Sequence, residues 1–135
     1  MQKIIVTCTT LVSLILTSHP VLAEQLRVDE FTTKEAGCGT YLSKPRSKKS
    51  VLWHFWGQPM EMRINGKKVL FNALKNGSNK KAIFLSQDQK IEVQLDVTKF
   101  GKFLYGEYQE IDRAILTVKK GKSKVKLNVT GGSGC

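Results

Sequence analysis

The fold is decided by residues 60–72, which read Met60-Glu61-Met62-Arg63-Ile64-Asn65-Gly66-Lys67-Lys68-Val69-Leu70-Phe71-Asn72. Apolar and polar side chains alternate from Met60 to Ile64, the pattern of a strand with one buried face. Asn65-Gly66 follows and favours a type I′ turn, because both central residues of that turn need a positive φ. Such a turn places Met62 opposite Val69 and Met60 opposite Phe71, so both strands direct apolar side chains to the same face. The stretch therefore predicts a β-hairpin.

Toward the C-terminus the chain keeps the period of strands. Residues 82–86 and 91–97 predict a second hairpin, and residues 111–118 and 123–129 predict a third. The aromatic stretch from 100 to 108 is interrupted by glycines and predicts no definite element.

Toward the N-terminus the pattern predicts strands at 51–56 and 38–42, and Leu26, Val28 and Phe31 alternate as in an edge strand. No segment has a helical period. We therefore predict an all-β fold, a small antiparallel β-sandwich or barrel of about seven strands. The pattern does not distinguish a sandwich from a barrel.

The first residues have the layout of a cleavable secretion signal. Lys3 supplies a positive start, residues 4–16 form an apolar run, and Val21-Leu22-Ala23 precedes the expected cleavage point. The run is shorter than the about 20 residues that a membrane-spanning helix needs. We expect residues 1–23 to be removed and residues 24–135 to form a single secreted or periplasmic β domain without a transmembrane segment.

Two of the three cysteines, Cys38 and Cys135, remain after this cleavage. In an exported chain that count favours one disulfide between them. The segment Gly131-Gly132-Ser133-Gly134 is interpreted as a flexible tether that lets Cys135 reach Cys38. Two free thiols, or a bond from Cys135 to a second chain, remain alternatives because connectivity does not follow from sequence. We expect a monomer.

Catalytic chemistry has little support in the residue types. His54 is the only histidine after cleavage, and it lies in an apolar strand, where a structural role is the more usual one. Triads and Cys–His dyads need a histidine beside a nucleophile, and zinc sites need three or four ligands. The carboxylates fall at solvent-facing strand positions, so no pair stands out for glycoside hydrolysis. We predict no enzyme, no cofactor and no metal.

The basic surface is the most unusual property of the chain. The formal charge is +11 for the whole sequence, and about +10 without Lys3. One cluster lies at residues 44–49 and a second at residues 119–126. Such charge attracts anionic partners: acidic polysaccharide, envelope polymers or acidic proteins. Nucleic acid is not expected, because no binding module is recognisable. The alternative is a solubilising face that also protects a strand edge.

Trp53 and Trp56 lie on opposite faces of the predicted strand, so one of them is partly exposed if only one face is buried. An exposed tryptophan beside a basic loop suits a sugar ring or an acidic glycan, whereas the alternative is a central strand buried on both sides. The candidate ligand-binding residues are Lys44, Arg46, Lys48, Lys49, Trp53 and Trp56.

These observations predict a non-catalytic, secreted or periplasmic binding protein for an anionic envelope or extracellular ligand. Two alternatives stay open. One is a protein-interaction or inhibitor domain that acts on an acidic secreted enzyme. The other is a structural component of the cell envelope.

Overall fold

In the computed structural model, the described residues 25–33, 37–74, 80–104 and 106–135 form an antiparallel all-β structure. The expected signal, residues 1–23, lies outside the described residues. Within the described ranges, no helix is long and apolar enough to cross a membrane. The strands are β1 (Val28–Asp29), β2 (Gly39–Ser43), β3 (Leu52–Phe55), β4 (Met60–Ile64), β5 (Lys67–Ala73), β6 (Lys81–Ser86), β7 (Ile91–Leu104), β8 (Tyr108–Lys120) and β9 (Ser123–Gly134).

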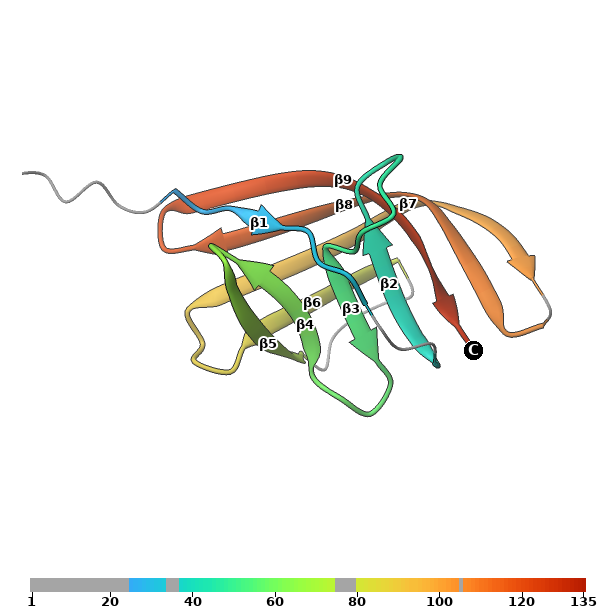
Figure 1. Cartoon of the computed structure of the whole chain (residues 1–135), viewed down its shortest axis with the longest axis horizontal. Coiled ribbons are helices and arrows are strands. Elements are labelled where there is room, and N and C mark those ends of the chain that lie inside the picture. Colours follow the sequence, from blue (N-terminus) through green and yellow to red (C-terminus); the bar gives the residue numbers. More distant parts are fainter. Residues whose placement is uncertain (1–24, 34–36, 75–79, 105) are drawn as a thin grey trace, which may run out of the picture.

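The strands from β2 to β9 close into a barrel. Each pairs with the next strand along the chain, and β9 pairs back with β2. This up-and-down order leaves no free edge in the ring. Figure 1 shows the long strands β8 and β9 running along one side, with the shorter β3, β4 and β5 opposite them. Strand β1 lies outside the ring and pairs with β4. The closed ring identifies a barrel and not a sandwich.

The predicted hairpins are confirmed. Met60 pairs with Phe71 and Met62 with Val69, the register expected from the turn. The φ angles of 50° at Asn65 and 76° at Gly66 have the sign that a type I′ turn requires. The other two hairpins are β6–β7 and β8–β9. The aromatic stretch from 100 to 108, for which the sequence predicts no definite element, contributes to a further hairpin, because β7 continues to Leu104 and β8 begins at Tyr108.

The interpretation of residues 131–134 as a flexible tether is wrong, because they form the end of β9. They pair with β2 on one side, and residues in this segment also pair with β8 on the other. A Cβ added at Gly131 would lie 1.9 Å from the carbonyl oxygen of Tyr41, and one at Gly134 would lie 2.0 Å from that of Glu107. Gly131 therefore allows a close approach of backbones where β9 pairs with β2 and closes the barrel, and Gly134 allows one where β9 pairs with β8.

The predicted disulfide between Cys38 and Cys135 is present within the chain. Each cysteine lies next to the paired ends of β2 and β9, where Gly39 faces Gly134. The bond thus joins the first and last strands of the ring beside their hydrogen-bonded ladder.

The core lies in the barrel interior. Inward and outward side chains alternate along the strands, as barrel closure requires. The largest fully buried side chains include Phe71, Leu42, Leu52, Met60, Met62, Leu116, Val51, Val93, Val118 and Val129.

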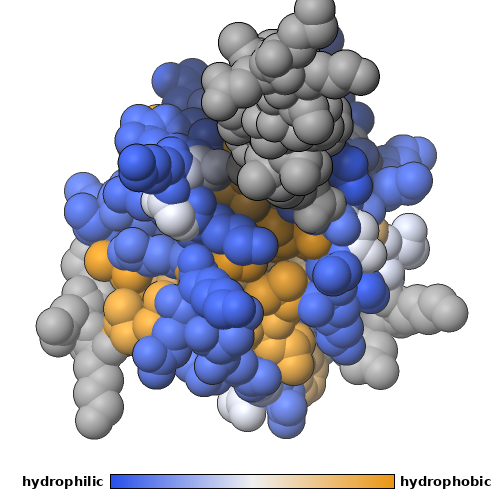
Figure 2. All heavy atoms as spheres, turned by 90° about the vertical axis from the view of Figure 1, so that its left-hand side faces the viewer, coloured by the Kyte–Doolittle hydropathy of each residue, from blue (hydrophilic) through white to orange (hydrophobic). Residues whose placement is uncertain are grey.

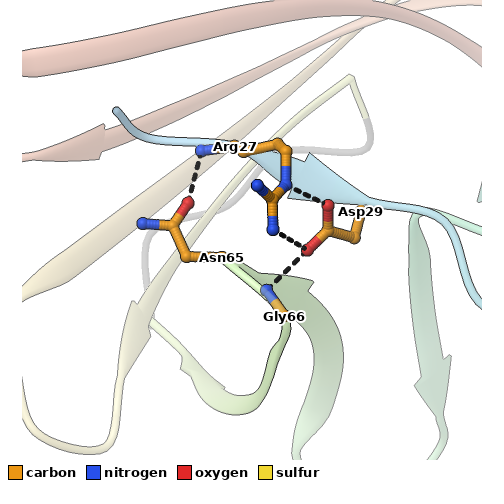
Figure 3. A network of polar contacts seen from close by, with 4 residues as sticks. All are labelled: Arg27, Asp29, Asn65 and Gly66. Atoms are coloured by element: carbon orange, nitrogen blue, oxygen red, sulfur yellow. Dashed lines mark hydrogen bonds and ion pairs between the residues drawn. The ribbon is translucent and has the colours of Figure 1, made fainter. Parts of the chain in front are cut away.

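Polar contacts fix β1 to the β4–β5 turn (Figure 3). The backbone N–H of Arg27 donates to Asn65 Oδ1 at 2.7 Å, and the N–H of Asn65 donates to the Arg27 carbonyl at 2.9 Å. The Asp29 carboxylate accepts from the Gly66 N–H at 2.6 Å and pairs with the Arg27 guanidinium. The hydrogen bond from Arg27 is the main cause that holds the pKa of Asp29 below its ordinary value. The turn that sets the hairpin therefore also positions the N-terminal strand.

The meander gives the barrel two unlike ends. The β2–β3 loop and the β4–β5, β6–β7 and β8–β9 turns lie at one end, here called the turn end. The β3–β4 loop, the β7–β8 connection and the disulfide lie at the other, here called the mouth end. Figure 2 views the side with the β8–β9 turn, where hydrophilic side chains surround an apolar area.

Candidate functional site

The basic loop, residues 44–49, connects β2 to β3 and projects from the barrel (Figure 1). The side chains of Arg46, Lys48 and Lys49 are exposed, and Lys44 is half-buried. The Ser47 N–H donates to the Lys44 carbonyl at 3.0 Å, and Ser47 Oγ accepts from the Lys49 N–H at 3.2 Å. These bonds shape the loop into a turn, with a φ of 66° at Arg46.

A groove of about 720 Å³ lies on the outer face of the barrel between this loop and the disulfide. We call it the aromatic groove. Its lining includes Tyr41 from β2, Trp53 from β3, Tyr108 from β8 and Lys48 from the basic loop. The structure thus brings one lysine of the loop and one of the two tryptophans to the same concave surface.

Strand register explains why aromatic rings gather there. Tyr41 lies between Trp53 on β3 and Gly132 on β9. Gly132 has no side chain, so Tyr108 reaches across β9, and a Cβ at Gly132 would meet the Tyr108 hydroxyl at 1.8 Å. The rings of Tyr41 and Tyr108 stack with centroids 6.3 Å apart and an interplanar angle of 24°.

The tyrosine pair is also joined by a hydrogen bond between its hydroxyl groups. Burial, and next the hydrogen bond with Tyr41, raises the pKa of Tyr108 well above its ordinary value. A tyrosine phenol is neutral at physiological pH even at its ordinary pKa of about 10, and the raised pKa extends this neutral range. Tyr108 therefore contributes a polar but uncharged group to the groove that Lys48 also lines.

The two tryptophans occupy different places. Trp53 is half-buried on the outer face, where its ring lies 6.4 Å from that of Phe55. Trp56, just beyond β3, is 49% exposed and lies at the mouth end. The expectation that one tryptophan is partly exposed is confirmed, and the alternative of a strand buried on both sides is wrong.

A second pocket, of about 590 Å³, opens the barrel interior at the mouth end. We call it the mouth pocket. His54 and Trp56 line it, together with Glu107. Burial lowers the pKa of His54, and its ring makes an edge contact with Phe84 at 5.8 Å. Both side chains line the pocket, but among the described residues no hydrogen bond or ion pair joins His54 to Glu107.

The candidate residues therefore separate in space. Lys48 and Trp53 share the aromatic groove, Trp56 lines the mouth pocket, and Lys44, Arg46 and Lys49 line neither. The lysines of the second cluster lie on the β8–β9 hairpin, outside both pockets. Sequence reasoning did not identify Tyr41 and Tyr108, because their approach depends on Gly132 from a third strand.

Among the described residues, no group of three His, Cys, Asp or Glu side chains is placed to hold a metal ion. Comparisons with protein-family models, curated proteins and solved structures find no match to this chain. Fold and site together define an eight-stranded up-and-down β-barrel, with one added strand, one disulfide and an aromatic groove on its outer face.

Proposed function

We propose that the protein is a non-catalytic binding protein, secreted or periplasmic, that recognises an anionic polysaccharide or envelope polymer through the aromatic groove. The observation that carries the proposal is the shared lining of Lys48 and Trp53. Aromatic faces stack on sugar rings, and an exposed lysine pairs with a carboxylate or sulfate of the ligand. The disulfide supports the location, because such bonds persist in oxidising compartments.

The neighbouring charges support an acidic ligand. The basic loop adds Arg46 and Lys49 near the groove without lining it. Such charges raise the local concentration of anions and the association rate, an effect that salt screens. The groove then provides the contacts that distinguish one polymer from another.

The test compares two charge reversals on the whole protein, Lys48→Glu and Lys122→Glu. Both change the net charge equally, but Lys122 lies in the β8–β9 turn, outside the groove. Isothermal titration with heparin and polygalacturonate is expected to show about tenfold weaker binding for Lys48→Glu and less than about twofold for Lys122→Glu. Tyr41→Leu is expected to weaken binding as well, with dextran as the neutral comparison. Equal losses of affinity in both charge reversals would show that binding depends on net charge alone and would refute recognition by the aromatic groove.

A protein-interaction or inhibitor role is the second candidate, favoured by the projection of the basic loop from the barrel. A protruding loop can enter the cleft of an acidic enzyme, as interface anchors do. Capture of a secreted acidic protein that is lost with Arg46→Glu but kept with Tyr41→Leu would favour this candidate over the polysaccharide. A structural role in the envelope is a weaker candidate, because Cys135 is already bonded within the chain.

A further inference from the structure

The mouth pocket has the composition of a ligand site and has no part in the proposed function, which uses the aromatic groove. Its wall is mainly apolar, and it includes buried residues of the barrel interior: Leu52, Phe84, Leu95 and Ile111. Pockets that are largely apolar with a few polar groups are typical binding sites for small molecules. The volume of about 590 Å³ lies in the usual range for such sites.

The rim of the pocket is unusually apolar for an exposed surface. Phe103 is 60% exposed, Trp56 49% and Phe100 37%, and all three line the pocket. Large exposed aromatic side chains that gather at one place indicate a binding surface, whereas scattered ones do not. The pocket therefore leads from an aromatic rim to an aliphatic interior.

The polar groups of the pocket limit the charge of a ligand. Among the described lining residues there is no lysine or arginine, and Glu107 is the only acidic one. The hydroxyls of Thr40 and Ser133, joined by a hydrogen bond of 2.7 Å, are neutral. A carboxylate or sulfate would meet no lysine or arginine here and would be repelled by Glu107. Burial lowers the pKa of His54, which disfavours the cationic form of that side chain. This pocket thus differs in charge preference from the aromatic groove.

We propose that the mouth pocket binds one aliphatic chain that carries an uncharged polar head, of the monoacylglycerol or fatty alcohol class. The interior of an eight-stranded barrel is just wide enough for side chains or one small ligand, which favours a chain over a broad ring system. The chain lies against Leu52, Phe84 and Leu95, and the head stays at the rim beside Thr40 and Ser133.

The two tryptophans allow the test, because each reports on one site. Trp53→Phe leaves Trp56 as the only tryptophan, at the rim of the mouth pocket. We expect monolauroylglycerol, added below its micelle concentration, to change the emission of this variant saturably. Laurate, with the same chain, is expected to bind at least about tenfold more weakly at neutral pH. Glu107→Gln is expected to reduce the difference in affinity between laurate and monolauroylglycerol without changing the affinity for monolauroylglycerol.

Ala82 lines the pocket, so Ala82→Phe places a ring inside it. This variant is expected to weaken ester binding more than about tenfold while it keeps its circular dichroism and its binding of polygalacturonate. Phe103→Asp, at the most exposed rim residue, tests the same site if Ala82→Phe does not fold, and it is expected to weaken ester binding. The absence of saturable binding in fluorescence and native mass spectrometry would overturn the proposal. So would an unchanged affinity in the folded variants, or tighter binding of 1-naphthol than of the ester.

Discussion

Replacing Gly131 with alanine tests whether the C-terminal segment closes the barrel. An added Cβ would lie 1.9 Å from the carbonyl oxygen of Tyr41, whereas carbon–oxygen contacts between neighbouring strands lie at about 3.3–3.6 Å. The obstacle is backbone, so relief requires β9 to move away from β2 by roughly 1.5 Å. That movement weakens ladder hydrogen bonds worth about 1 kcal/mol each, in addition to an overpacking cost of about 1–3 kcal/mol. We expect Gly131→Ala to lower the free energy of unfolding by about 2–4 kcal/mol.

Gly132 provides the matched comparison. There the added Cβ would meet the side chain of Tyr108, and not backbone. A side chain can rotate away, so we expect Gly132→Ala to cost less than Gly131→Ala. Tyr108→Ala should recover part of the Gly132→Ala cost in a double-mutant cycle, because it removes the obstructing ring. Tyr108→Ala is not expected to recover the stability lost in Gly131→Ala, because the obstacle there is the backbone carbonyl oxygen of Tyr41.

Urea unfolding of the disulfide-bonded protein, followed by tryptophan fluorescence, measures these differences. Thr130→Ala, on the same strand, serves as the control for a change that adds no atom. If the free energy of unfolding of Gly131→Ala lies within about 0.5 kcal/mol of the wild-type value, residues 131–134 behave as a tether. The closure of the ring by β2 and β9 would then be refuted.

Two further predictions concern the ends of the chain. Replacing both Cys38 and Cys135 with serine opens a loop with a sequence separation of 97. We expect this change to lower the free energy of unfolding in urea by up to about 4–5 kcal/mol. A decrease of less than about 1 kcal/mol would contradict the loop-closure reasoning. Asp29 has a pKa below the ordinary 3.8, so its contribution to stability is present above that pH and is lost as the pH falls through the folded-state pKa. Asp29→Asn should therefore lose less stability than the wild type on acidification below about pH 4, and equal losses in acid unfolding would count against the Arg27–Asp29 contact.

Local patterns predicted the elements whose partners are near in sequence. The hairpin of residues 60–72 carries its register in its own turn and alternation, so Met60 and Phe71 could be paired in advance. The disulfide followed from the cysteine count and the expected compartment.

Closure of the barrel could not be predicted in this way, because the pairing of β2 with β9 joins residues far apart in the chain. The composition Gly131-Gly132-Ser133-Gly134 indicates flexibility in isolation, but small residues also serve where backbones approach closely. The aromatic groove depends on that same contact. Tyr41 and Tyr108 are distant in sequence and meet only because Gly132 lies between them without a side chain.

The two lysine clusters differ in what they can do, although the sequence gives them equal weight. On the β8–β9 hairpin, Lys119 lies directly opposite Lys124, an arrangement that costs stability through repulsion. Glu92 on β7 pairs with Lys119 in register and offsets part of that cost. These lysines lie on strands outside both pockets, where they attract anions at long range and oppose self-association. Among the described lysines, Lys48 lines the aromatic groove, whereas Lys68 lines two smaller hollows of about 310 and 420 Å³ beside Trp53. Selectivity for a ligand of the aromatic groove should therefore follow Lys48, while salt-dependent attraction follows the whole surface.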